Sequence, residues 1–344
     1  MYSVHGRTSP NVCALGESPR GRRRGTDLRH AVRSLLILTL LSPNHHVVVF
    51  GSPPLIQTVV VPRSFSAADE WFTTAADILQ RDGVVVLSCA ELLSLAPPQR
   101  AAINVLEGRL KRVADRGGDI LEPFSFSEIV HRSPKRYDCS LPTGGTSPFS
   151  LRVNELVKAV LAAKGKTSPA VVRDGIVTSF PGASAQPMHA DGEEDGVFNA
   201  FVPLVDVSTQ GTEFWLGTHQ EEHPKRIALA EKRRSRRAAG DEEEETPTTR
   251  RDLQELEAES SEQERSFIVP TSLARAGGVV LFDYRVLHRG RAHAGSEGKG
   301  EGQEELGQQA SSSPRPVFYR VFAVGDNHGA DAHNFPANSL DDST

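Results

Sequence analysis

The 344-residue sequence has little of several features that define particular protein classes. It holds only three cysteines, Cys13, Cys89 and Cys139, which are too few and too scattered for a disulfide scaffold or a thiolate metal site. It has no apolar run near the roughly 20 residues that a membrane-spanning helix needs. The net charge is −5, so the whole chain lacks the basic footprint of a nucleic-acid-binding protein. We therefore expect an intracellular protein, cytoplasmic or organellar, without a membrane span.

The first 64 residues differ from the rest because they are rich in arginine and poor in acids. Such a start is typical of an organellar transit peptide, but also of a plain N-terminal extension. We predict an N-terminal extension over residues 1–64, a folded domain over 65–330 and a C-terminal tail over 331–344. Two polar, low-complexity inserts, residues 221–265 and 292–314, have too little apolar surface to fold alone, and we expect disordered loops there.

Helical periodicity marks the start of the predicted domain. Ser66 and Asp69 match an S-x-x-D capping box, and apolar residues recur at helical spacing from Trp71 until Asp82 and Gly83 stop the pattern. A short buried strand is expected next. The expected elements of this part are a helix from about 71 to 82, a strand over 84–87 and helices over 99–114 and 154–163.

Beyond residue 171 the pattern changes to short β-branched and aromatic runs separated by Gly, Pro, Asn and Asp. The expected strands cover residues 175–180, 197–204, 212–216, 278–282 and 316–324. Several short strands without intervening helices indicate an antiparallel β-sandwich or barrel. The fold class is therefore mainly β with N-terminal helices.

The pattern with the most chemical content is His189-Ala-Asp191. On an extended segment, residues i and i+2 point to the same side, so an imidazole and a carboxylate can meet at one metal ion. By itself the pair is a weak signal, because a loop histidine near a solvated aspartate gives the same pattern. About a hundred residues later, a strongly apolar strand ends at His288. Together the three residues match a 2-His-1-carboxylate facial triad, which leaves positions open for a chelating cosubstrate and O₂.

Arg315 enters the next strand, where it is either a surface charge or a bidentate partner for the carboxylate of a dicarboxylate cosubstrate. Arg320 lies in the same strand and is the alternative. The two differ by an odd number of positions, so a regular strand turns them to opposite faces.

Other polar residues near the motif have weaker signals. Asn199 and Gln186 are candidates to orient the metal ligands by hydrogen bonds, or they satisfy backbone groups of turns. His219 and His223 have the i,i+4 spacing of a helical metal pair, although Pro224 argues against a helix there.

Four stretches in a fixed order carry a family resemblance: QPMHADG (186–192), FNAFVPLVDVSTQGTEFWLGTHQ (198–220), GGVVLFDYRVLHRG (277–290) and RPVFYRVFA (315–323). With them, the chain resembles the phytanoyl-CoA dioxygenase-like branch of the Fe(II)/2-oxoglutarate-dependent oxygenases. The resemblance implies a double-stranded β-helix, a jelly roll of the cupin type. It also implies His189, Asp191 and His288 as iron ligands and Arg315 as the partner of the far carboxylate of 2-oxoglutarate.

The implied cofactors are Fe(II), 2-oxoglutarate and O₂, and the implied reaction is hydroxylation of an unactivated C–H in a small organic or acyl substrate. Two alternatives stay open on the residues alone: a cupin-type metalloenzyme that acts as an isomerase or hydrolase, and a non-catalytic binding module on the same fold. Arg315 favours the oxygenase, because a cupin isomerase needs no dicarboxylate anchor. The substrate and the oligomeric state do not follow from the sequence.

Overall fold

The structure is a computed structural model. It describes residues 56–62, 69–95, 97, 99–206, 211–223, 225, 228, 258–259, 268–270, 278–293, 313–325, 335 and 338–340. Most of the predicted N-terminal extension, residues 1–64, and most of the two predicted inserts lie outside these residues.

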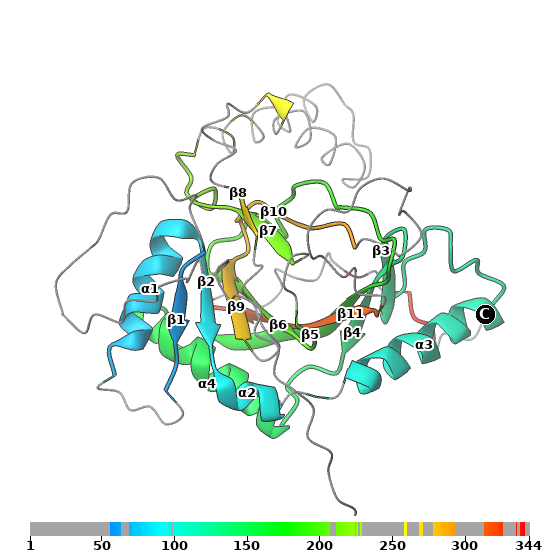
Figure 1. The fold of residues 1–344 in the computed structure, drawn as a ribbon, viewed down its shortest axis with the longest axis horizontal. Coiled ribbons are helices and arrows are strands. Elements are labelled where there is room, and N and C mark those ends of the chain that lie inside the picture. Colours follow the sequence, from blue (N-terminus) through cyan, green and yellow to red (C-terminus); the bar gives the residue numbers. More distant parts are fainter. Residues whose placement is uncertain are drawn as a thin grey trace, which may run out of the picture. The chain divides into compact units, whose positions relative to one another are not determined.

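A large mixed sheet forms the centre of the described part, with the strand order β1-β2-β9-β6-β11-β5-β4-β3 (Figure 1). Its strands are β1 (Thr58–Val60), β2 (Val84–Ser88), β3 (Ile129–Ser133), β4 (Arg136–Leu141), β5 (Ala170–Ser179), β6 (Val197–Pro203), β9 (Gly278–Asp283) and β11 (Arg315–Ala323). Strands β1 and β2 are parallel, and every other neighbouring pair is antiparallel.

A second, three-stranded sheet has the order β10-β7-β8. It consists of β7 (Thr212–Trp215), β8 (Ile268–Pro270) and β10 (His288–Gly290). Phe214 of β7 packs edge-on against Phe282 of β9, with the ring centroids 5.0 Å apart, and both belong to one buried apolar cluster. The two sheets therefore pack against each other, and β10 places His288 between them.

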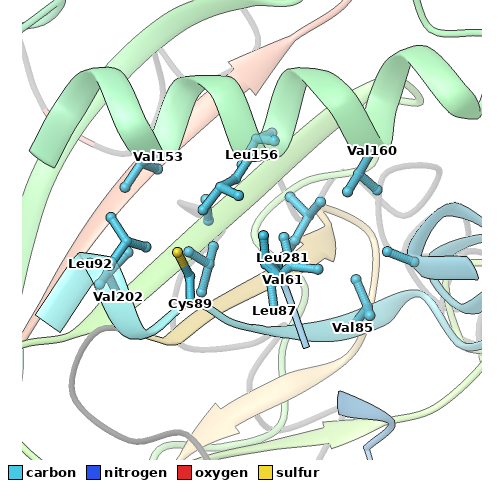
Figure 2. Close-up of a cluster of buried hydrophobic side chains, with 14 of the residues drawn as sticks. Val61, Val85, Leu87, Cys89, Leu92, Val153, Leu156, Val160, Val202 and Leu281 are labelled. Carbon is cyan, nitrogen blue, oxygen red and sulfur yellow. The ribbon is translucent and has the colours of Figure 1, made fainter. Parts of the chain in front are cut away.

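Among the described residues, four helices come before β5: α1 (Trp71–Asp82), α2 (Ala90–Leu95), α3 (Gln99–Asp115) and α4 (Pro148–Ala163). Helix α4 contacts α1 and α2. Figure 2 shows its buried residues Val153, Leu156 and Val160 facing Leu87 of β2 and Leu281 of β9. These side chains define the helix-covered face of the large sheet. The alternate residues of the same strands point to the other face, where the second sheet lies.

The ends of α1 and α4 show which residues cap these two helices. Gly83 ends α1 in the left-handed conformation, with φ of 78°, as the sequence predicted. The N-cap of α1 is Glu70, which makes no side-chain capping bond, so the helix does not begin at the predicted capping box. Ser66 of that box lies outside the described residues. Helix α4 begins six residues before the predicted start because the Ser147 side chain caps it.

The mainly β class with helices in the N-terminal half is confirmed, and each of the predicted helices and strands is present within a few residues of its expected bounds, apart from an early start of α4 and β5. Strand β1 lies inside the stretch predicted as N-terminal extension, and Leu340 of the predicted tail is buried in an apolar cluster. Among the helices of the described residues, none has both the length and the apolar composition to cross a bilayer.

Candidate metal centre

The backbone brings His189 and His288 together although 98 positions of sequence separate them. The His189 N–H donates to the His288 carbonyl at 2.8 Å, and the His288 N–H donates to the His189 carbonyl at 2.7 Å. The two residues are therefore directly opposite each other, as in a hydrogen-bonded pair of an antiparallel ladder, and both side chains point to the same face. The imidazole centroids lie 4.7 Å apart.

Both imidazoles have the same second hydrogen bond. His189 Nδ1 lies 2.9 Å from the Pro187 carbonyl oxygen, and His288 Nδ1 lies 3.0 Å from the Val286 carbonyl oxygen. A carbonyl only accepts, so Nδ1 carries the proton in both rings. Each neutral ring then presents the Nε2 lone pair, which is the form that binds a metal ion.

Asp191 completes the group. Its Oδ1 lies 3.6 Å from His288 Nε2 and 3.9 Å from His189 Nε2. Asn199 donates a hydrogen bond to the other oxygen, Oδ2, and so directs Oδ1 to the imidazoles. Within the described residues this is the one set of three such ligands, and its ligand atoms all lie within 4.8 Å of one another. The group fits a single ion bound by two nitrogens and one oxygen at about 2 Å each.

The centre is closed on one side and open on the other. His288 is buried and its ring lies between Phe214 and Phe282, at centroid distances of 5.6 and 5.0 Å. The side chains of His189 and Asp191 are 29% and 20% exposed, against 4% for His288. Further ligands can therefore reach an ion from the His189 and Asp191 side only.

Arg315 lies on the face of the large sheet that carries the centre. Asn199 stands opposite Val321 in the β6–β11 register, and Val321 is an even number of residues from Arg315. Arg315 is 7% exposed, its Nε has no hydrogen-bond partner, and Nη2 lies 3.5 Å from the Arg291 carbonyl oxygen. Burial, followed by the charges of Arg136 and Arg291, lowers the pKa of Arg315 to about 10.

Arg320, the alternative from the sequence, faces the helices instead. It makes two hydrogen bonds of 2.6 and 2.7 Å to the Asp174 carboxylate, and a third to the Ser150 carbonyl oxygen of α4. Its charge is already neutralised by a buried partner. Arg315 is thus the arginine of β11 that is turned to the metal centre and free of a carboxylate within the described residues.

Two of the weaker candidates have defined contacts. Asn199 bonds to Asp191, as above, and the Gln186 side chain accepts from the Gly290 backbone N–H at 3.1 Å, next to the bridge between the two histidines. His219 Nε2 bonds instead to the Gln80 carbonyl oxygen at the end of α1. The described residues bring no third ligand to His219 and His223.

Sequence reasoning missed Arg136, the first residue of β4, which is almost fully buried. No motif surrounds it. Strand β4 itself was not predicted, so nothing in the sequence placed this arginine near Arg315.

No protein-family model and no curated protein sequence matches the chain. Among solved structures, it is similar to SnoN, a non-heme alpha ketoglutarate dependent epimerase from nogalamycin biosynthesis, at 14% identity and a TM-score of 0.40, over 74% of this chain and 80% of SnoN.

The carbocyclase SnoK, also described as non-heme and alpha ketoglutarate dependent, is similar at 16% identity and a TM-score of 0.41, over 78% of this chain and 93% of its own. AviO1 from Streptomyces viridochromogenes Tue57 is similar at 16% identity and a TM-score of 0.42, over 74% of this chain and 95% of AviO1. Likeness at this level does not establish a shared fold or activity, so the function has to be inferred from the side chains of the site.

Proposed function

We propose that the protein is an Fe(II)- and 2-oxoglutarate-dependent dioxygenase of the phytanoyl-CoA dioxygenase-like type, which hydroxylates a small organic or acyl substrate. The observation that carries the proposal is the convergence of His189 Nε2, Asp191 Oδ1 and His288 Nε2, on the sheet face that also holds the unpaired Arg315. The two sheets that pack around this group would be the major and minor sheets of a double-stranded β-helix.

Each residue has a distinct task in this proposal. His189, Asp191 and His288 hold the iron, and Asn199 fixes which carboxylate oxygen faces it. Arg315 holds the far carboxylate of 2-oxoglutarate by a charge-assisted, bidentate hydrogen bond. When bound, iron and 2-oxoglutarate would let O₂ oxidise an unactivated C–H bond, with one oxygen atom entering the product and the other entering succinate, which is released with CO₂. Phe214 and Phe282 exclude water from the His288 side.

The test is an anaerobic titration of the metal-free protein with Fe(II) and 2-oxoglutarate. We expect the weak visible charge-transfer band of a 2-oxo acid chelated to Fe(II). His189→Ala removes one ligand and should abolish the band. His223→Ala removes an imidazole outside the centre and should leave it unchanged.

The other outcomes separate the alternatives. Tight iron binding without the band would contradict the oxygenase and favour a cupin-type isomerase or hydrolase. Absence of metal binding in the wild type would favour a non-catalytic module. If the band forms, succinate release in a substrate screen then identifies the compound that is hydroxylated.

A further inference from the structure

The turn between β9 and β10 contacts both parts of the metal centre. It supplies the carbonyl that orients the His288 ring. Within the same turn, the Tyr284 carbonyl accepts from the Asp191 backbone N–H at 3.1 Å, and the Tyr284 N–H donates to the Val197 carbonyl oxygen at 3.0 Å. Tyr284 therefore holds both ends of the loop that joins the ligand Asp191 to β6, residues 192–196, which we call the ligand loop.

A buried ion pair fixes the backbone of Tyr284. Asp283 and Arg285, the residues on either side of it, are joined by two hydrogen bonds of 2.9 and 3.0 Å from the guanidinium to the carboxylate. Asp283 Oδ1 also accepts from the Arg285 backbone N–H at 3.1 Å. Asp283 is fully buried and Arg285 is 9% exposed, so water competes little for these contacts. The turn between β9 and β10 is thus held by its own side chains.

Arg285 also reaches a second carboxylate, in the ligand loop. Its Nη2 lies 2.8 Å from Asp195 Oδ1, while Asp195 Oδ2 lies 3.2 Å from Lys166 Nζ. Burial raises the pKa of Asp195, but the hydrogen bond from Lys166 and the charge of Arg285 outweigh it and lower the pKa of this carboxyl. Because Asp283 already neutralises the guanidinium, the second carboxylate is not needed to compensate a buried charge. The second contact instead joins the turn to the ligand loop.

The ligand loop depends on such contacts because few of its side chains are buried. Of its five residues, Gly196 alone is buried, while Asp195 is exposed. A Cβ at Gly192 would lie 2.5 Å from the Tyr284 ring, so this glycine lets the ring lie directly on the loop. Regions with few buried contacts open at low cost in free energy. An anchor at Asp195 therefore limits how far the backbone that follows Asp191 can move.

We propose that Arg285 is a positioning residue for the metal ligand Asp191: through its ion pair with Asp195 it holds the ligand loop against the turn that orients His288. The two parts of the centre, which come from distant parts of the chain, then keep the spacing that one ion needs. This inference rests on the metal-binding part of the proposed function and does not involve 2-oxoglutarate. Arg285 itself contacts neither the ion nor a substrate.

The experiment measures the Co(II) affinity of the full-length protein by competition titration, without 2-oxoglutarate. The main variant is Asp195→Ala, which leaves the buried pair of Asp283 and Arg285 intact and so spares the fold. We expect roughly fivefold weaker Co(II) binding, the upper end for a half-exposed ion pair. Salt screens such a pair, so in 1 M NaCl the difference from the wild type should shrink to less than about twofold.

Asp115→Ala is the matched control. It removes an aspartate of α3 whose side chain is 58% exposed, against 61% for Asp195, and which pairs with Lys111. Its Co(II) affinity should equal that of the wild type. An Asp195→Ala protein with wild-type affinity would overturn the inference. A loss that stays the same in 1 M NaCl would overturn it too, since it would show a structural role of the side chain without an ion pair.

A second variant, Arg285→Lys, tests whether the arginine acts through Asp195. The ammonium of lysine can neutralise Asp283 but lacks the planar fork that reaches two carboxylates at once. We expect the same roughly fivefold loss of Co(II) affinity, and no further loss when Asp195→Ala is added to it. Losses that add up in the double variant would contradict the inference, because the two residues would then act independently.

The failure of this inference is distinguishable from that of the proposed function. If the wild type binds Co(II) but gives no charge-transfer band with Fe(II) and 2-oxoglutarate, the oxygenase fails, while weaker Co(II) binding by Asp195→Ala still supports the role of Arg285. If the band forms and Asp195→Ala binds Co(II) like the wild type, the role of Arg285 fails and the oxygenase stands. A wild-type protein that binds no metal would overturn both.

Discussion

At the scale of single residues, the candidate centre is defined by hydrogen bonds behind the ligands. The backbone carbonyls of Pro187 and Val286 set the tautomers of the two histidines. An amide sets the orientation of the carboxylate: Asn199, buried on β6, donates to Asp191 Oδ2 and leaves Oδ1 facing the two imidazoles. Ligands held in this way lose little freedom when a metal binds.

Asn199→Ala should therefore weaken metal binding while the three ligands stay in place. Loss of such a supporting hydrogen bond typically costs about 10- to 100-fold in metal affinity. Competition titration with Mn(II) or Co(II) measures it. Asn338→Ala removes an exposed amide that bonds to the Ser125 carbonyl and serves as the control. An Asn199→Ala protein that binds metal like the wild type would show that Asp191 needs no such support.

At the scale of elements, Gly83 connects the first helix to the chain that carries His288. It ends α1 with φ of 78° and leads directly into β2. Its carbonyl accepts from the Asp283 backbone N–H, at the end of β9. A Cβ here would lie 2.3 Å from a methyl of Val286 and 2.5 Å from His219 Nδ1. Val286 in turn supplies the carbonyl that orients His288, so the end of α1, the start of β2 and the turn before this candidate ligand meet at Gly83.

Gly83→Ala should destabilise the protein more than Gly117→Ala. Both glycines have a positive φ, of 78° and 79°, so both substitutions bear the strain of the left-handed region, about 1–2 kcal/mol. Only Gly83 has neighbours within 4 Å of the added methyl. Overpacking adds about 1–3 kcal/mol to the loss in the free energy of unfolding. Urea unfolding of the two variants gives the difference, and equal losses would mean that the Val286 turn moves freely aside.

At the scale of the whole molecule, the described residues form a sheet that extends beyond the domain limits expected from the sequence. Strand β1 adds to the sheet edge in parallel with β2, and Ile56, Val59 and Val61 are buried there. At the other end of the chain, Leu340 is buried beside α3 and its backbone N–H donates to Glu128. The domain limits of 65 and 330 remain a prediction that truncation can test.

We expect a chain that lacks residues 1–64 to be less stable than one that lacks residues 1–50. Only the longer deletion removes β1 and uncovers the edge of β2. Each buried aliphatic side chain contributes about 1.5–3 kcal/mol, so the loss in the free energy of unfolding should reach several kcal/mol. Chemical denaturation of the two proteins measures it. Equal stabilities would place the start of the domain at residue 65, as the sequence predicted.

The sequence by itself indicated many of the elements and the ligand candidates, because these depend on local patterns. Alternation and helical spacing predicted most strands and helices, and the H-x-D pair with a distant histidine at a strand end pointed to His189, Asp191 and His288. Residues an odd number of positions apart on a regular strand point to opposite faces. This alone predicted that Arg315 and Arg320 face opposite ways.

Only the tertiary structure decided which of these side chains meet and which charges are already neutralised. Asp174 pairs with Arg320 across β5 and β11, while Arg136 comes from a strand that the sequence did not reveal and lies beside Arg315. Such facts depend on which strands become neighbours and in which register. That is a property of long-range pairing, and no local window of the sequence contains it.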